Sequence, residues 1–497
     1  MSEFCDFLIV GGGVAGCIVA RRLAERTSGR IILVEAGKSD ENDPIANDLS
    51  RLDEQTDAMD WGYRASPISG GGQVLKYPRA RILGGCANHN DCAFLVPPPS
   101  DFEDWERQGA TGWGPSGIAR YFGRVDERVA TTLVRGGNPV SQAFVDAGLE
   151  MGLDLVDFRA RIEPGAGWFP LNTKGALRQA TSVAYLHPLS ALPKHLEVWT
   201  ETFVSKLLIE DGAAIGAQTS RGRIMARRQV ILTAGAINTP QLLLLSGIGP
   251  AAELMRLGIP VVTDLPGVGR HLLDHVAAPV VLDLAEPVPA WTLTPFEATM
   301  LVAVEDGQEA PDVLFHFGLR VREKYAGASR LGQPRNGVKI SPNVARSRSE
   351  GSVTLASPEP RDAPVIDLNY LSDPGGYDSR VLLKAIQLAR HLGKTKALQK
   401  FGAKEVAPGP DVQSNDELAA FIRQTCETVY HCAGTTRMGD PSDRRTVVDP
   451  HLRVQGIRNL RVADASVFPS MVSVNIANTV MMIAEKAVDA VLADGGG

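Results

Sequence analysis

The sequence predicts an α/β protein that begins with a βαβ unit, and three observations lead to this prediction. The chain has 497 residues, more than a single hydrophobic core usually organises. Hydrophobic residues make up 44% of it and charged residues 22%, as in an ordinary globular enzyme. Residues 6–37, DFLIVGGGVAGCIVARRLAERTSGRIILVEAG, read as an apolar strand, a glycine turn, an amphipathic helix and a second apolar strand. We therefore expect more than one domain, the first of them built on this unit.

Charge and hydropathy exclude two classes of partner. The net charge of −6 offers no basic excess with which to neutralise a phosphate backbone, so we do not expect nucleic acid binding. The longest apolar stretch, VILTAGAINTPQLLLLSGIG, is interrupted by polar residues before it could span a bilayer. The amino terminus lacks the pattern of a secretory signal. These features predict a cytoplasmic protein without a membrane span.

The glycines of the first turn predict a dinucleotide site. Gly11, Gly13 and Gly16 stand in the G-x-G-x-x-G register, which allows a tight turn, close approach of a pyrophosphate and close helix packing. Glu35 ends the second strand, where a carboxylate can accept hydrogen bonds from the ribose hydroxyls. This pattern fits FAD and NAD alike. The absence of a second such fingerprint downstream favours a resident flavin.

Residues 81–92, RILGGCANHNDC, hold two cysteines with His89 between them, and they raise the alternative of a metal or thiol centre. Zinc sites usually pair one short Cys hook with a second hook elsewhere, and the sequence has no second hook. The two thiols are not spaced as C-x-x-C, so a thioredoxin-like role lacks its motif. We expect no metal site. The six cysteines are too scattered for a disulfide framework.

Several separated blocks resemble the glucose-methanol-choline oxidoreductases. They are ARILGGCANHNDCAFLVPPPSDFEDWERQGATGWG (80–114), ILTAGAINTPQLLLLSGIGP (231–250), LPGVGRHLLDH (265–275) and the carboxyl-terminal segment 429–492 from VYHCAGTTRMG to AVDAVL. The resemblance spans nearly the whole chain in the order of the family. The segment G-G-C-x-x-H-N-x-C and the tetrapeptide TVYH are most similar to the choline oxidase branch.

This resemblance implies a Rossmann-like FAD-binding domain of discontinuous segments and a substrate domain on an antiparallel sheet. The expected FAD-binding parts are residues 1–155, 195–280 and 425–497, and the expected substrate parts are 156–194 and 281–424. Strand-like runs near 197–235 and 312–357 are compatible with this division. A homodimer is an open alternative to a monomer.

The resemblance also implies a catalytic pair. Removal of a hydride from an alcohol requires a base within reach of the hydroxyl proton, and histidine suits this role near neutral pH. His431 matches the catalytic histidine of the family, and Asn475 matches its partner position, where it would orient the alcohol oxygen. Cys432 stands where most members have proline, and Ala477 where a second asparagine is usual.

The remaining implied contacts concern the cofactor. Val204 matches the position that holds the adenine, and Asp464 with Ala465 matches the approach to the pyrophosphate or ribityl chain. Gly84 and Gly85 would bring backbone close to the flavin, and Asn90 matches the asparagine of this loop. His89 occupies the position of a histidine joined covalently to the flavin 8α-methyl carbon in the choline branch, so the resemblance implies FAD bound through His89.

The implied substrate is a small primary alcohol. Trp61, Tyr430 and Glu297 resemble the aromatic walls and the carboxylate of a pocket for a trimethylammonium head, where aromatic faces attract the cation. Asp91 replaces a small residue of the choline branch, which argues against choline itself. We expect hydride transfer to FAD and then to oxygen, with Val429 matching a residue near the oxygen-reactive face. An FAD dehydrogenase that reduces a quinone or another acceptor, and a non-redox hydroxynitrile-lyase-like flavoprotein, remain alternatives.

Overall fold

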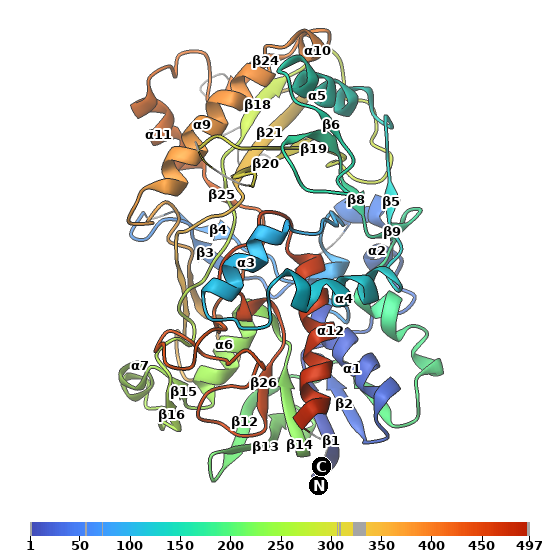
Figure 1. Cartoon of the computed structure of the whole chain (residues 1–497), viewed down its shortest axis with the longest axis vertical. Coiled ribbons are helices and arrows are strands. Elements are labelled where there is room, and N and C mark those ends of the chain that lie inside the picture. The colour runs from blue at the N-terminus through green and yellow to red at the C-terminus, as the bar shows by residue number, and fades with distance from the viewer. Residues whose placement is uncertain are drawn as a thin grey trace.

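A computed structural model describes residues 2–54, 57–71, 73–305, 307, 310–321 and 334–494. The described chain contains two large sheets, one in the lower half of the molecule and one in the upper half (Figure 1). This arrangement confirms the predicted α/β class, with a Rossmann-like part and an antiparallel-sheet part.

The lower sheet is mainly parallel and includes the predicted βαβ unit. Its first strand pairs in parallel with two neighbours, one on each side, and an antiparallel hairpin extends one edge. Because parallel strands end at the same edge of a sheet, the glycine turn and the end of the next strand meet there. Its strands, in spatial order, are β11 (Leu196–Trp199), β2 (Ile31–Val34), β1 (Glu3–Val10), β14 (Gly222–Leu232), β13 (Ala213–Thr219) and β12 (Val204–Glu210), and β26 (Leu460–Val462) also pairs with β14.

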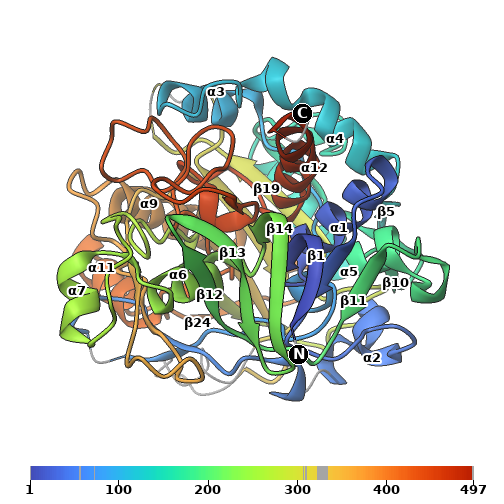
Figure 2. The ribbon, with the colours of Figure 1, turned by 90° about the horizontal axis from the view of Figure 1, so that it is seen from below.

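Helices cover this sheet because each has an apolar stripe to bury. The helix α1 (Val14–Arg26) begins at the glycine turn and buries eight residues. The long helix α12 (Ala477–Asp494) packs against α1, as the view from below shows (Figure 2). The other helices of this part are α2 (Pro44–Asn47), α3 (Pro99–Arg107), α4 (Pro115–Asp126), α6 (Gly235–Leu245) and α7 (Ala251–Arg256).

The upper sheet is antiparallel over most of its width. The helix α9 (Tyr377–Leu392) packs on β21, and α5 (Pro139–Glu150) packs on β19 and β7. Two further helices, α10 (Lys396–Gln399) and α11 (Asn415–Thr425), pack on these two. Its strands, in spatial order, are β24 (Lys404–Ala407), β18 (Val280–Asp283), β21 (Gly337–Val344), β20 (Val313–Gly318), β19 (Ala298–Val302), β7 (Gly165–Trp168) and β6 (Leu155–Val156), with β17 (Val276–Ala277) and β25 (Glu427–Thr428) at one side.

Smaller sheets complete the fold. A four-stranded sheet contains β22 (Ser352–Thr354), β23 (Val365–Asp367), β3 (Arg64–Ser66) and β4 (Leu75–Lys76). Three two-stranded pairs are β5 (Thr132–Leu133) with β8 (Pro170–Leu171), β9 (Thr173–Lys174) with β10 (Leu177–Arg178), and β15 (Ile248–Gly249) with β16 (Thr263–Asp264).

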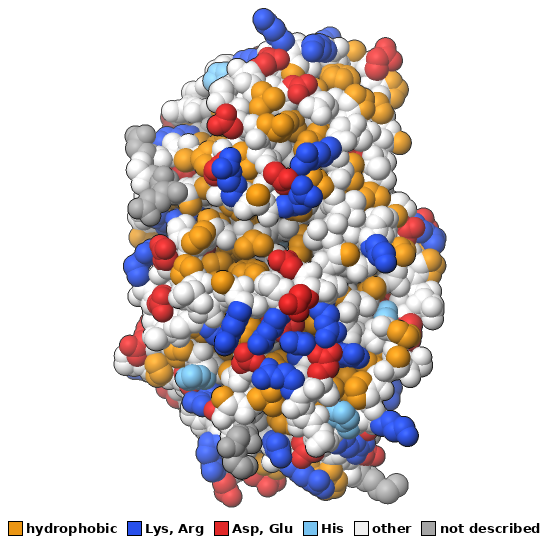
Figure 3. Space-filling view, turned by 45° about the vertical axis from the view of Figure 1, so that its right-hand side comes forward, with side chains coloured by type: hydrophobic (Ala, Val, Ile, Leu, Met, Phe, Trp, Pro, Cys, Tyr) orange, Lys and Arg blue, Asp and Glu red, His pale blue; other side chains and the backbone are white. Residues whose placement is uncertain are grey.

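The surface mixes charges of both signs. On the face in Figure 3, basic and acidic side chains lie interspersed among apolar ones. Beneath this surface, an ion pair between Arg22 and the buried Glu485, 3.0 Å apart, joins α1 to α12. None of the described helices has the length and hydropathy needed to cross a membrane.

Candidate active site

A cavity of ≈ 780 Å³ connects the two halves of the molecule. This volume lies in the range of ligand sites. The first glycine turn and the end of β2 line it on one side, and residues of β20, β21 and β25 line it on the other. Of the residues predicted for the site, the cavity wall includes Gly11, Gly13, Glu35, Trp61, Gly85, His89, Asn90, Val204, Tyr430, His431, Asp464, Ala465 and Asn475.

The glycine turn at one end of the cavity has the shape that a pyrophosphate requires. A Cβ at Gly11 would lie 2.7 Å from Ala234 Cα, and one at Gly16 would lie 1.9 Å from Gly11 O, so neither position admits a side chain. A Cβ at Gly13 would meet no protein atom closer than 3.9 Å, because this residue faces the cavity. Gly16 itself lies outside the lining and serves the packing of α1 on β1.

Glu35 lies at the same end of the cavity and is buried. Its Oε2 accepts a hydrogen bond from Gly12 N at 2.8 Å, and its Oε1 accepts one from Gly37 N at 2.7 Å. Burial raises the pKa of this carboxyl to about 7. A carboxyl beside the glycine turn, with backbone-fixed orientation, is suited to accept hydrogen bonds from ribose hydroxyls. The residues present therefore fit the adenosine and pyrophosphate parts of FAD.

Val204 and Asp464, predicted to contact the adenine and the pyrophosphate or ribityl chain, also line the cavity. The Asp464 carboxylate, however, binds protein groups. Val204 begins β12 beside Phe203, and the Trp61 ring lies 6.3 Å from the Phe203 ring. The carboxylate of Asp464 accepts hydrogen bonds from Gly235 N, at 2.9 Å, and from Thr239 Oγ1, at 2.7 Å. Asp464 thus holds the start of α6 at the cavity wall.

The loop 84–92 lies against the first glycine turn. Gly85 has a φ of +55°, and a Cβ there would lie 2.7 Å from Gly13 Cα, so the two loops touch through glycines. Gly84 does not line the cavity. A Cβ at Gly84 would lie 2.5 Å from Asn88 Nδ2 and from Ser182 Oγ, which explains the glycine by protein packing.

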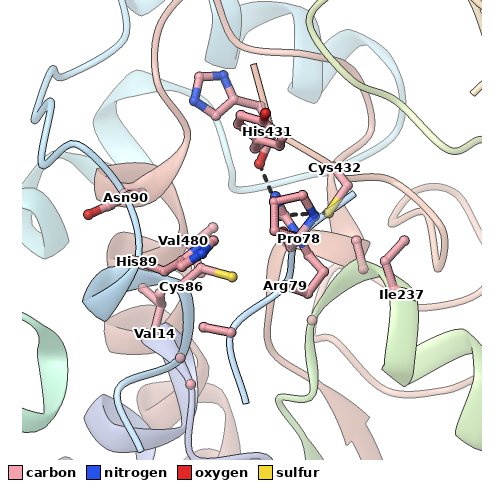
Figure 4. Close-up of a pocket in the computed structure, with 18 of the residues that line it drawn as sticks. Val14, Pro78, Arg79, Cys86, His89, Asn90, Ile237, His431, Cys432 and Val480 are labelled. Carbon is pink, nitrogen blue, oxygen red and sulfur yellow. Dashed lines mark hydrogen bonds between the residues drawn. The ribbon is translucent and has the colours of Figure 1, made fainter. Parts of the chain in front are cut away.

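His89 and Asn90 lie in this loop and line the cavity. Asn90 Oδ1 accepts hydrogen bonds from Cys92 N and from the buried Arg178, both at 3.2 Å. In Figure 4, His89 and Cys86 lie on the opposite side of the pocket from Arg79 and Cys432. A cofactor that fills the cavity would pass between these two sides.

The predicted catalytic residues meet in the cavity. His431 Nε2 lies 3.3 Å from Asn475 Nδ2, and the same amide nitrogen lies 3.5 Å from His316 Nε2. Asn475 Oδ1 has no hydrogen-bond partner among the described residues. Burial lowers the pKa of His431 well below its ordinary value. A buried, neutral imidazole can accept a proton at neutral pH.

A second histidine determines which nitrogen of His431 can accept that proton. His275 Nε2 lies 2.8 Å from Ala345 O and 2.9 Å from Val472 O, so it must carry hydrogen to donate. In neutral His275, Nδ1 is then the acceptor, and it lies 2.8 Å from His431 Nδ1. His431 therefore donates from Nδ1 and has its lone pair on Nε2, toward Asn475.

The backbone of this loop is fixed by one buried carboxylate, Asp274. Its Oδ1 accepts hydrogen bonds from the backbone N–H groups of His275, at 2.9 Å, and His431, at 2.8 Å. Its Oδ2 accepts hydrogen bonds from three hydroxyl groups, those of Tyr77, Tyr370 and Thr428. Charge-assisted hydrogen bonds are among the stronger ones in proteins. Asp274 thus ties the catalytic loop to its surroundings.

Of the three residues predicted to enclose a cationic head, Trp61 and Tyr430 line the cavity and Glu297 does not. The Glu297 side chain is outside the cavity lining, because its Oε1 accepts a hydrogen bond from Thr292 N at 2.9 Å. The neighbouring Phe296 lines the cavity instead. Trp61 is stacked on Tyr63, with 6.0 Å between ring centroids. Tyr430 lines the cavity with a φ of 68°.

Sequence reasoning did not assign roles to Asp274, His275, His316, Arg79 and Lys339. Asp274 and His275 end the quoted block LPGVGRHLLDH, so their position in a family block was the available signal. His316 and Lys339 lie on strands whose register brings them to the cavity, which a single sequence does not reveal.

The structure places the two cysteines of residues 81–92 in different surroundings. Within the described ranges, no group of three or more His, Cys, Asp or Glu side chains could hold a metal ion. Cys92 is buried and Cys86 faces the cavity, both as free thiols.

Comparison with known proteins places the chain in a family. Two GMC oxidoreductase family models match it, one over residues 5–277 and the other over residues 347–484. The chain is 36% identical to choline oxidase of Arthrobacter globiformis over 97% of its length and 93% of the relative. It is 35% identical to the mitochondrial choline dehydrogenase of Homo sapiens over 97% of its length and 89% of the relative.

A solved structure supports the same assignment. The crystal structure of pyridoxine 4-oxidase from Mesorbium loti matches with a TM-score of 0.89 and 27% identity, and the match covers 98% of both chains. The chain therefore belongs to the GMC oxidoreductases and is an FAD-dependent oxidoreductase that acts on CH–OH donors.

Proposed function

We propose that this protein is an alcohol oxidase in which His431 removes the hydroxyl proton of a small primary alcohol. The observation that carries the proposal is the lone pair of His431 Nε2, directed at Asn475 inside a cavity that also contains Glu35 and the glycine turn. FAD, when bound, accepts the hydride and passes two electrons to oxygen, so that alcohol and O₂ become aldehyde and H₂O₂.

The residues around the base would divide the remaining work. Asn475 would hold the alcohol oxygen, since its amide lies between His431 and His316. Burial keeps His431 neutral before the reaction, and the hydrogen bond to His275 keeps its Nδ1 protonated. The cavity walls would exclude bulk water from the alcohol.

We further propose that the FAD is attached through His89 and that the chain divides as the resemblance implies. The FAD-binding parts would be 1–155, 195–280 and 425–497, and the substrate parts 156–194 and 281–424. The strands of the lower sheet all lie within the first group, which supports the division, whereas α5 and Leu155 of β6, which fall before the first boundary, pack with the upper sheet. The short strands β17 and β25, which join the upper sheet, would then form the boundary.

An anaerobic screen of small primary alcohols tests the proposal. The expected result is bleaching of the flavin absorbance by a substrate, followed by recovery and stoichiometric peroxide when air enters. Bleaching without peroxide would replace the oxidase by a dehydrogenase, as in the choline dehydrogenase relative. A flavin that no alcohol bleaches would contradict the proposal.

A further inference from the structure

The strand register of the upper sheet brings a lysine to the cavity beside the catalytic groups. In the antiparallel pair β20 and β21, His316 lies opposite Ser341, and Gly318 lies opposite Lys339. Because side chains alternate along a strand, Lys339 and Ser341 point to one face. His316, Lys339 and Ser341 all line the cavity, and His316 reaches Asn475.

The absence of a side chain at Gly318 makes room for Lys339. A Cβ at Gly318 would lie 3.0 Å from Lys339 Cγ and 2.9 Å from Phe296 Cε1, so both side chains occupy the space above this glycine. Lys339 Nζ lies 5.7 Å from the centre of the Phe296 ring, a cation–π distance. The lysine therefore has a defined course along the cavity wall.

A glutamate on β25, which pairs with β17 beside β21, fixes the ammonium group. Glu427 Oε1 lies 3.2 Å from Lys339 Nζ and accepts a hydrogen bond from Ser341 Oγ at 3.3 Å. Lys339 and Glu427 are 9% and 4% exposed, respectively. Because desolvation offsets much of the attraction within a buried ion pair, stability alone is a weak reason for a pair at this position.

The charges at this end of the cavity are mixed, with cations in the lining where a carboxylate was expected. Glu297, the carboxylate expected to face a cationic group, lies outside the lining, whereas Arg320, Lys339 and Glu427, which pairs with Lys339, are in it. A trimethylammonium group held near Phe296 and His316 would lie beside a fixed ammonium group of the same sign.

We propose that Lys339 determines specificity and that the substrate is a primary alcohol whose far end carries an anionic oxygen group, such as a carboxylate. This proposal rests on the proposed function, since the carbinol would lie at His431 and Asn475 while the anion binds the ammonium of Lys339. Glu427 and Ser341 hold the ammonium in place, and the rings of Phe296 and Phe169 enclose the body of the substrate. A charge-assisted contact in a desolvated wall favours the anion over a neutral isostere.

Binding of three matched, unreactive probes to the holoenzyme tests this assignment apart from turnover. The probes are 4-methylbenzoate, 4-methylbenzamide and (4-methylbenzyl)trimethylammonium, and the dissociation constants come from flavin difference spectra. The expected order is anion, neutral, cation, with the anion bound about tenfold or more tightly than the amide. A cation bound as tightly as the anion, or no preference for the anion over the amide, would overturn the proposal.

Substitutions at Lys339 and Glu427 then test whether this ion pair causes the preference for the anionic probe. K339M should abolish the preference for 4-methylbenzoate, K339R should retain most of it, and E427Q should increase it, because the carboxylate of Glu427 then no longer competes for the ammonium. The double variant K339M/E427Q removes both charges and should resemble K339M, which controls for a buried unpaired glutamate. Flavin absorbance and the thermal midpoint confirm that each variant is folded. An unchanged preference in K339M and in the double variant would contradict the role of Lys339.

Turnover measurements distinguish a failure of the proposed specificity from a failure of the proposed oxidase function, on which the specificity rests. With 4-(hydroxymethyl)benzoate, anaerobic bleaching is expected in the wild type, and the ratio of kcat/KM for this alcohol to kcat/KM for benzyl alcohol should be about tenfold lower in K339M. A protein that prefers the anionic probes but bleaches with no alcohol would contradict the oxidase function alone. One that oxidises benzyl alcohol or choline better than the carboxylate would contradict the specificity alone.

Discussion

The Nδ1 atoms of His275 and His431 lie 2.8 Å apart, and one of the two must therefore donate to the other. The carbonyl oxygens around His275 Nε2 decide the direction, because they require hydrogen on that atom. His275 thus acts through His431 as a positioning residue: it selects the tautomer in which the catalytic Nε2 is free to accept a proton.

Replacement of His275 by alanine should leave the His431 tautomer unspecified. We expect kcat/KM to fall by about tenfold to a hundredfold, with the acid limb of its pH profile displaced. Asparagine at 275 should restore part of the activity, because its amide oxygen can accept from His431 Nδ1. Steady-state kinetics across pH provides the measurement. Equal losses in the alanine and asparagine variants, with an unchanged pH profile, would indicate a packing role only.

Replacement of His431 by alanine should remove the base itself. General bases contribute about 10²- to 10⁴-fold to rate, so kcat should fall by that amount while the flavin content is retained. Asn475→Ala should cost less, because it orients the alcohol without taking its proton. Rapid-reaction measurement of anaerobic flavin reduction isolates this step. Reduction at the wild-type rate in His431→Ala would exclude His431 as the base.

The pH dependence of kcat/KM should reflect the lowered pKa of His431. The base must be neutral to react, and burial lowers its pKa well below the ordinary value of 6.5. Lowering the pH from 8 to 6.5 should therefore leave His431 unprotonated, and activity should fall only at more acidic pH. Rates in overlapping buffers at constant ionic strength test this. An acid limb centred at 6.5 or above would show that the imidazole is not held neutral.

The lowered pKa of His316 also makes the stability of the folded protein depend on pH. Burial lowers its pKa to about 3, whereas in the unfolded chain it is expected near 6.5. Between these values the unfolded state binds the extra proton, so stability should fall as the pH drops from about 6.5 toward 3. The loss is measured by comparing the thermal midpoints of the wild type and His316→Asn across this pH range. The variant should show a weaker decline over that window, and an equal decline in both proteins would refute the assignment to His316.

The bond between His89 and the flavin is testable without substrate. If His89 carries FAD, acid precipitation should leave the yellow colour in the pellet, and His89→Ala should release it to the supernatant. The mass of the wild-type chain should exceed that of the apoprotein by one FAD. Colour in the supernatant of the wild type would show a noncovalent cofactor.

Substitutions of Gly13 and Gly16 in the first turn should have different effects. Gly16→Ala should destabilise the fold, because its Cβ would lie 1.9 Å from Gly11 O. Gly13→Ala should fold, since its Cβ would meet no protein atom closer than 3.9 Å, but it should retain less FAD because the methyl group points into the cavity. Thermal unfolding and the flavin-to-protein absorbance ratio distinguish the two results. Full flavin content in Gly13→Ala would place the pyrophosphate elsewhere.

Local patterns were sufficient to predict the first βαβ unit and the acidic residue, Glu35, that follows its second strand. The apolar runs at 7–10 and 31–34, with glycines between them, specify strands and a turn from neighbouring residues alone. The strands near 197–235 and 312–357 are present for the same reason, and they confirm that part of the prediction. The hairpin strand β13 was not singled out, since its run of Ala and Gly has low strand propensity.

The substrate end of the site depended on pairings that local patterns do not contain. Glu297 immediately precedes β19, and the neighbouring Thr292 N–H, rather than a ligand, binds its carboxylate. Lys339 reaches the cavity only because β21 pairs with β20 in one register and because residue 318 opposite it is glycine. Tautomer selection by His275 similarly depends on two carbonyls, one of them 197 positions away in the chain.

The five hydrogen bonds on Asp274 separate proton chemistry from molecular recognition. They anchor the His431 loop from within, one of them through Thr428 of β25, whereas Lys339 and Ser341, which would meet the far end of a substrate, stand on β21. Substitutions on the facing strands could therefore exchange one alcohol for another while the base keeps its position. Such a division would let one proton-abstracting apparatus be reused across substrates as unlike as those in the names of the choline and pyridoxine oxidases.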